Sequence, residues 1–204
     1  MYDIVLLLIS LMVCVTVHEA AHAWVAYKLG DPTPKIQGRV SLNPGRHLDP
    51  LGTLMIFLIH FGWGKPVIFN YYNLKHPRRD SALIALAGPF TNLLTALLLA
   101  LILKYLTPPE FLVRVLMSIY DLSIVLFLFN LLPIAPLDGS KLVGLFVPAS
   151  KEDWYQKFLS QGPIYLIIIV IGDRLIQEIS GFSFLGTYLS VGYTFVTSFI
   201  RLNT

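Results

Sequence analysis

Hydrophobic residues along the chain gather into long segments that shorter polar stretches separate. The first covers 3–27, and as a helix it would be about 37 Å long, enough to cross the roughly 30 Å hydrocarbon core of a bilayer. The segment 51–61 is apolar but too short to span, so we expect a partial or re-entrant helix there. Four further apolar segments predict spanning helices: 81–106, 111–132, 164–179 and 182–200.

The composition favours a membrane protein over a soluble one. Hydrophobic residues make up 55% of the 204 residues and charged residues only 13%, whereas about a quarter of a typical soluble domain is charged. We therefore predict an all-α polytopic membrane protein with about five spanning helices and one re-entrant helix. We expect a single domain over 1–204, with a core at about 3–145 and a C-terminal helical pair at about 163–200. The apolar N-terminus has no positive n-region, so we interpret it as a retained helix.

The basic residues predict an orientation. Residues 28–80 hold eight Lys and Arg, the short loop 107–110 holds none, and 133–162 holds three. If 51–61 does not cross, all the basic loops fall on one side, which the positive-inside rule makes cytoplasmic. No basic cluster suggests a nucleic-acid partner. The lone Cys14 excludes an intrachain disulfide, and we interpret it as a small packing residue.

Two histidines and a glutamate lie within the first apolar segment, where ionisable groups are costly and usually functional. His18, Glu19 and His22 form H-E-x-x-H, and histidines four residues apart lie on one face of a helix. Both imidazoles can then bind one Zn²⁺, with Glu19 as general base. A catalytic zinc needs a third protein ligand from elsewhere in the chain.

The third ligand is best supplied by Asp138, in the sequence NLLPIAPLDGSKL. Asp138 follows the end of an apolar segment and a Pro-x-x-Pro break, on the same predicted side as His22. The other acids fit less well, since Asp121 would lie in mid-span and Asp173 and Glu178 belong to a later helix. A turn aspartate is the alternative for Asp138, because Asp-Gly is common in turns.

Three motifs together resemble the signatures of the site-2 protease family of intramembrane metalloproteases. They are HEAAH, the GPFTN of 88–92 and the NLLPIAPLDG of 130–139. RVSLNPGRHLDPLGT and GWGKPVIFN also resemble the short bacterial and archaeal form of that family, without PDZ or CBS domains, and the resemblance covers about 15–145.

The resemblance implies one zinc per chain, bound by His18, His22 and Asp138, with Glu19 activating water. It also suggests that Asn92 and Asn130 orient the substrate backbone or the oxyanion. A structural hydrogen bond between helices is the alternative for Asn92. Gly88-Pro89 can instead kink its helix or admit close packing, and we assign it no chemical role.

The expected function is a zinc endopeptidase that cuts peptide bonds in or near transmembrane helices of membrane proteins. Its partners would be those substrates and the lipid bilayer, and its active site would be reached from the cytoplasmic side of a cell membrane. A substrate helix must unwind before attack, and an extended peptide can pair with a strand edge. We therefore expect short strands, forming small β-hairpin elements, at 39–42 and 65–69. The alternative is a catalytically silent homologue that binds membrane proteins.

Overall fold

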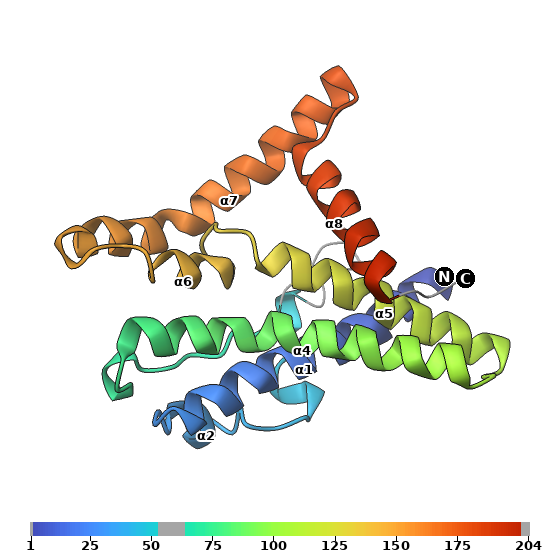
Figure 1. Ribbon diagram of the computed structural model, residues 1–204, viewed down its shortest axis with the longest axis horizontal. Helices are drawn as coiled ribbons and strands as arrows, with labels where there is room; N and C mark the ends of the chain where they lie inside the picture. The colour runs from blue at the N-terminus through green and yellow to red at the C-terminus, as the bar shows by residue number, and fades with distance from the viewer. Residues whose placement is uncertain (1, 53–63, 201–204) are drawn as a thin grey trace.

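The computed structural model describes residues 2–52 and 64–200, and these form an almost entirely helical chain (Figure 1). The four longest helices are α1 (Tyr2–Lys28), α4 (Pro77–Tyr105), α5 (Glu110–Asn130) and α7 (Glu152–Ser180). A fifth helix, α8 (Phe184–Ile200), ends the described chain. Short helical turns occupy the connections: α2 (Thr33–Ile36), η1 (Pro44–Arg46), η2 (Tyr71–Asn73), α6 (Gly139–Val143) and η3 (Ala149–Lys151).

Among the described residues, four helices are long and apolar enough to cross a membrane: α1, α4, α5 and α7. The expected fifth span, α8, is apolar and has 17 residues within the described part of the chain. At about 1.5 Å per residue it is about 25 Å long, somewhat short of the hydrocarbon core. The expected re-entrant helix at 51–61 falls almost wholly outside the described residues.

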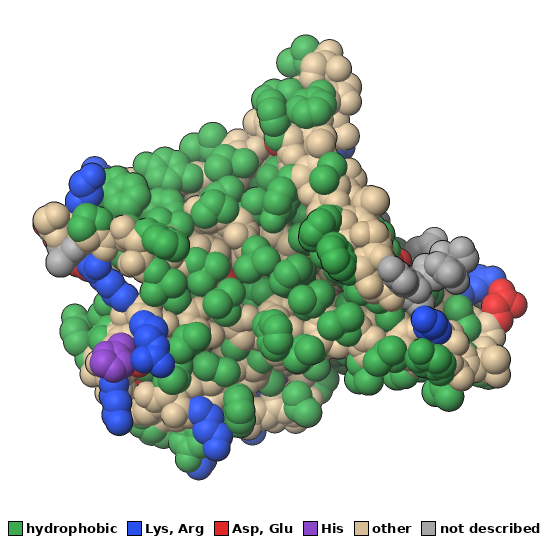
Figure 2. All heavy atoms as spheres, in the orientation of Figure 1, with side chains coloured by type: hydrophobic (Ala, Val, Ile, Leu, Met, Phe, Trp, Pro, Cys, Tyr) green, Lys and Arg blue, Asp and Glu red, His purple; other side chains and the backbone are tan. Residues whose placement is uncertain are grey.

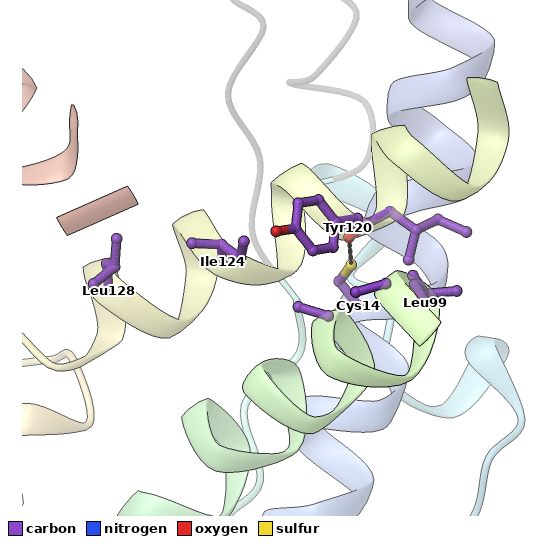
Figure 3. Close-up of a cluster of buried hydrophobic side chains, with 8 residues drawn as sticks. Cys14, Leu99, Tyr120, Ile124 and Leu128 are labelled. Carbon is purple, nitrogen blue, oxygen red and sulfur yellow. Dashed lines mark hydrogen bonds between the residues drawn. The ribbon is translucent and has the colours of Figure 1, made fainter. Parts of the chain in front are cut away.

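Helices α1, α4 and α5 pack against one another as a bundle (Figure 1). Small side chains allow the close approach. Cys14 of α1 is buried where the three helices meet (Figure 3), and Ala96 and Ala100 of α4 belong to the same buried cluster. Polar pairs add interhelical hydrogen bonds: Ser10 to Ser118 at 2.7 Å between oxygens, and Cys14 to Ser123 at 3.2 Å between sulfur and oxygen. Cys14 thus lies in the packing core.

The last two helices leave the bundle and return to it. Helix α7 is buried only near its start, and Figure 1 shows it extending away from the bundle before α8 comes back to α5. The Tyr193 hydroxyl donates to Asp121 at 2.6 Å and so attaches α8 to α5. Asp173 accepts from the backbone N–H of Phe184 at 2.7 Å and closes the turn between α7 and α8. Asp121 and Asp173 therefore both have structural partners.

The expected β-hairpins are wrong, because neither 39–42 nor 65–69 forms a strand. Their backbone groups already have other partners. The Arg39 N–H donates to the Pro34 carbonyl at 2.8 Å, and the Val67 N–H donates to the Glu19 carboxylate at 2.9 Å. Pro66 has no N–H for a ladder. Near these two segments, Leu48 and Gly64 form a single antiparallel bridge that is not part of a strand.

Basic side chains gather at one end of the bundle. Figure 2 shows most of the visible Lys and Arg around α2 and the starts of α4 and α7, while hydrophobic side chains cover the face between this end and the opposite one. Helix α2, which follows α1, lies at this basic end together with the start of α4 and α6 (Figure 1).

Candidate metal centre

His18 and His22 lie one turn apart on α1 and face the same way, as the four-residue spacing predicts. Both residues are buried, with 7% of their surface exposed. Their rings meet edge to face, and the two Nε2 atoms are 3.0 Å apart.

The other ring nitrogen of each histidine has a partner on α4. Nδ1 of His22 lies 2.6 Å from the Ile84 carbonyl oxygen, which can only accept, so Nδ1 carries the proton. In the neutral imidazole this leaves the Nε2 lone pair facing His18. Such a bond to Nδ1 is what orients a histidine that binds metal through Nε2.

Asn92 on α4 contacts Nδ1 of His18, as the Ile84 carbonyl contacts Nδ1 of His22. Its Nδ2 lies 3.1 Å from Nδ1 of His18, and its own Oδ1 is buried with no hydrogen-bond partner. Turning the amide by half a rotation would let Oδ1 accept a hydrogen bond from Nδ1–H of His18. His18 would then also present an Nε2 lone pair.

Asp138 completes the group from a distant part of the chain. It lies between α5 and α6, immediately before Gly139, and its Oδ2 lies 3.1 Å from Nε2 of His18 and 3.3 Å from Nε2 of His22. Gly139 permits this close packing, because a Cβ there would overlap the carbonyl groups of Leu131 and Leu132.

The three converging atoms fit a zinc ion. Two ligand atoms bound to one zinc at 2.0–2.1 Å in tetrahedral geometry lie about 3.3 Å apart. The sides of the observed triangle, 3.0, 3.1 and 3.3 Å, are close to that value. Oδ2 of Asp138 is buried without a hydrogen-bond donor. Lone pairs that face one another in this way need a cation between them. Within residues 2–52 and 64–200 no other group of three such side chains converges.

Gly88 of α4 lies directly against the two imidazoles. A Cβ at this position would overlap Nε2 of His22 and would come within 2.6 Å of Nε2 of His18. Sequence reasoning gave Gly88 no chemical role. The GPFTN motif was the available signal, but the motif alone does not say what the glycine approaches.

The three proposed ligands line a cavity of about 180 Å³, and Glu19 lines it as well. Its Oε2 accepts from the Val67 N–H at 2.9 Å and lies 3.8 Å from the Arg39 guanidinium. Arg39 is buried and also donates to the carbonyl groups of Arg46 and Lys65. Burial lowers the pKa of Arg39, and the charge of Glu19 opposes that shift. Arg39 therefore connects Glu19 to two loop segments, a role that its sequence position did not reveal.

The two asparagines to which the family resemblance gave substrate roles, Asn92 and Asn130, differ in location. Asn130 lines the cavity, and its Nδ2 donates to the Leu126 carbonyl at 3.0 Å. Asn92 is fully buried behind His18 and is not among the residues that line the cavity. Lys141 lines the cavity as well; burial lowers its pKa, while the Asp138 carboxylate opposes that shift.

Comparison with known proteins identifies relatives of this chain. The model of peptidase family M50 matches residues 6–115, a range that includes His18, Glu19 and His22 and ends before Asp138. "Putative zinc metalloprotease YwhC" of Bacillus subtilis is 41% identical over 174 residues, which cover 81% of this chain and 80% of that protein.

"Putative zinc metalloprotease Rip2" is a more distant relative. The Mycobacterium tuberculosis protein (strain H37Rv) is 32% identical over 143 residues, and the Mycolicibacterium smegmatis protein is 28% identical over 141. Each alignment covers 66% of this chain and 54% of the relative, so the chain spans about half the length of the Rip2 proteins. No solved structure matches this chain significantly.

Proposed function

Because the chain belongs to peptidase family M50, the site-2 protease family of zinc metalloproteases, we propose that it cuts peptide bonds in or near the transmembrane helices of membrane proteins. The single observation that carries this proposal is the triangle formed by His18, His22 and Asp138, with Glu19 on the same cavity. Two of its residues lie on an apolar helix long enough to span a bilayer. Its substrates would then be membrane proteins within the lipid bilayer.

We assign one zinc ion per chain to His18, His22 and Asp138. The donor set of two imidazole nitrogens and one carboxylate oxygen is typical of catalytic zinc sites, which leave a fourth position open. When bound, zinc lowers the pKa of water towards about 7 and polarises the carbonyl group of the scissile bond.

Glu19 acts as the general base and then as the general acid. Its carboxylate removes a proton from the attacking water as the new C–O bond forms. It then delivers that proton to the leaving amide nitrogen as the C–N bond breaks. The Val67 N–H and Arg39 hold Oε2 in place, so Glu19 needs little reorganisation before the proton transfer.

The substrate is a locally unwound helix. A transmembrane helix keeps its amide groups hydrogen-bonded internally, so the scissile bond is exposed only after unwinding. The extended peptide would lie along Pro66, Val67 and Phe69, which line the cavity. The Asn130 amide, on the same cavity, would contact its backbone.

The charge distribution supports access to the active site from the cytoplasmic side. Basic side chains gather at one end of the bundle (Figure 2), and the metal centre is near that end because His22 lies close to the end of α1 and Asp138 next to α6. Cytoplasmic loops of membrane proteins carry the excess of Lys and Arg. Water and the polar flank of the substrate would enter from that end.

Cleavage of single-span substrates by the purified protein tests this proposal. Each substrate carries a helix-breaking pair within its span, and wild type is compared with Glu19→Gln and with chelator-treated wild type. We expect cuts inside the span that the chelator removes and that Glu19→Gln lacks although it retains its zinc. A zinc-loaded wild type that cuts none of the panel would favour a silent, substrate-binding homologue.

A further inference from the structure

A second cavity adjoins the metal centre on the basic side of the molecule. It has a volume of about 670 Å³, against about 180 Å³ for the cavity at the metal centre, and the two share Phe69 and Lys141 as lining residues. This volume falls within the range of about 300–1,000 Å³ that is usual for ligand sites. A peptide bound at the metal centre would continue into this second cavity.

The walls of the second cavity combine aromatic and charged side chains. Aromatic rings suit an extended peptide, because they offer a large contact area at a low cost in side-chain entropy. The main contributors are Phe69, Tyr71, Tyr72, Tyr155, Arg78 and Lys141.

Two of the three charged side chains that line this cavity, Arg78 and Glu152, pair with each other. Arg78 forms an ion pair with Glu152 and also donates to the Val147 carbonyl. Glu152 accepts a further hydrogen bond from Gln156 at 2.8 Å. This group connects the start of α4 to the start of α7 and leaves neither charge for a ligand.

Lys141 is the exception. Among the described residues its ammonium makes no ion pair, and it lies 3.5 Å from the Ser140 hydroxyl, a long contact for a hydrogen bond. The Asp138 carboxylate is nearby but directs its Oδ2 at the two histidines. The positive charge at the junction of the two cavities is therefore available to a ligand.

We propose that Lys141 selects substrates with an acidic side chain a few residues from the scissile bond, on the flank that enters the second cavity. An extended peptide advances about 3.3 Å per residue, so within a few residues of the cut it passes from the metal centre to the junction of the two cavities. A half-buried ammonium pairs with a carboxylate in surroundings of reduced dielectric, where the hydrogen bond is strengthened. This inference rests on the proposed protease function and names a substrate class for it.

An aspartate scan of the substrate tests the inference. One single-span substrate with a fixed helix-breaking pair carries Asp, or Asn as the neutral isostere, at successive positions on either side of the cut. Cut sites are located by mass spectrometry. For wild type we expect kcat/KM to be about tenfold higher for Asp than for Asn at one or two neighbouring positions on one flank only, mainly through KM.

Variants at position 141 test whether Lys141 causes the preference for Asp substrates. Lys141→Met should lower cleavage of the Asp substrates to the level of its Asn substrates and so lose the preference for Asp, whereas Lys141→Arg should keep it. Lys151→Met is the matched control, because exposed Lys151 lines neither cavity, and it should behave as wild type. Equal cleavage of all Asp and Asn substrates by wild type, or a preference that survives in Lys141→Met, overturns the inference.

A binding measurement separates this result from failure of the protease proposal. Fluorescent peptides spanning the cut, with Asp or Asn at the scanned positions, are titrated into Glu19→Gln protein. We expect tighter binding of the Asp peptide, which is lost in the Glu19→Gln, Lys141→Met double variant. If wild type cuts nothing while this difference holds, the protease proposal fails and Lys141 remains an acid-recognising residue. Identical binding of both peptides would exclude the proposed recognition role of Lys141, whether or not wild type cuts the substrates.

Discussion

Gly88 of α4 lies so close to His22 of α1 that a single methyl group at position 88 would overlap Nε2 of the imidazole. The two residues are far apart in the sequence and belong to the two helices that hold the metal centre. A glycine in mid-helix usually costs about 1 kcal/mol relative to alanine. The close contact between the helices explains why alanine would be worse here.

Gly88→Ala should therefore reduce the zinc content of the purified protein, although it improves helix propensity. Overpacking of this kind costs about 1–3 kcal/mol and would displace the imidazoles. Gly172→Ala is the matched control, because a Cβ at this helical glycine of α7 meets nothing within 4 Å. Metal analysis should show a loss in the first variant only. Full zinc in Gly88→Ala would mean that the imidazoles tolerate the methyl group.

Asn92→Ala should weaken zinc binding, because it leaves Nδ1 of His18 without its partner. Loss of such a partner typically costs about 10- to 100-fold in metal affinity. Asn92→Asp offers a carboxylate that accepts from Nδ1–H and should largely retain the metal. Competition with a zinc chelator measures both affinities. A substrate-orienting role for Asn92 predicts the contrary result, a raised KM with unchanged zinc affinity.

Asp138→Ala should lose the zinc, since only two of the three proposed ligands remain. Asp121→Asn is the control, because Asp121 pairs with Tyr193 between α5 and α8 and asparagine can still accept that hydrogen bond. Zinc-to-protein ratios after gel filtration should fall in the first variant and stay near one in the second. A ratio near one in Asp138→Ala would exclude this carboxylate as the third ligand.

Several features of the fold and the site could be predicted because they depend on local geometry. The apolar segments predict α1, α4 and α5 closely, and the four-residue spacing of His18 and His22 brings their Nε2 atoms together. The approach of Asp138 could be anticipated because an apolar helix and a proline-rich break return the chain to the same end.

The errors concern contacts between segments that are distant in the sequence. Residues 65–69 have the composition of a strand, but the Val67 N–H binds Glu19 and Pro66 has none to offer. Helix α7 begins at Glu152 although its first turns are polar, because those turns pack at the basic end through Tyr155 and Arg78. The hydrophobic pattern of one segment cannot reveal these contacts, because each partner lies far away in the sequence.

Arg39 provides the last prediction, because one guanidinium makes three interactions: hydrogen bonds to the carbonyl groups of Arg46 and Lys65, and an ion pair with Glu19 at 3.8 Å. Lysine keeps the charge but lacks the planar fork, so Arg39→Lys cannot make all three. The carboxylate of Glu19 would lose a fixed position, and a displacement of about 1 Å in a catalytic group can cost about 100-fold. We expect kcat to fall at least tenfold, with KM and zinc content nearly unchanged. Arg46→Lys is the control, since the Arg46 side chain is exposed and its carbonyl is unaltered. A parallel loss of zinc in Arg39→Lys would instead assign Arg39 to the stability of the whole site.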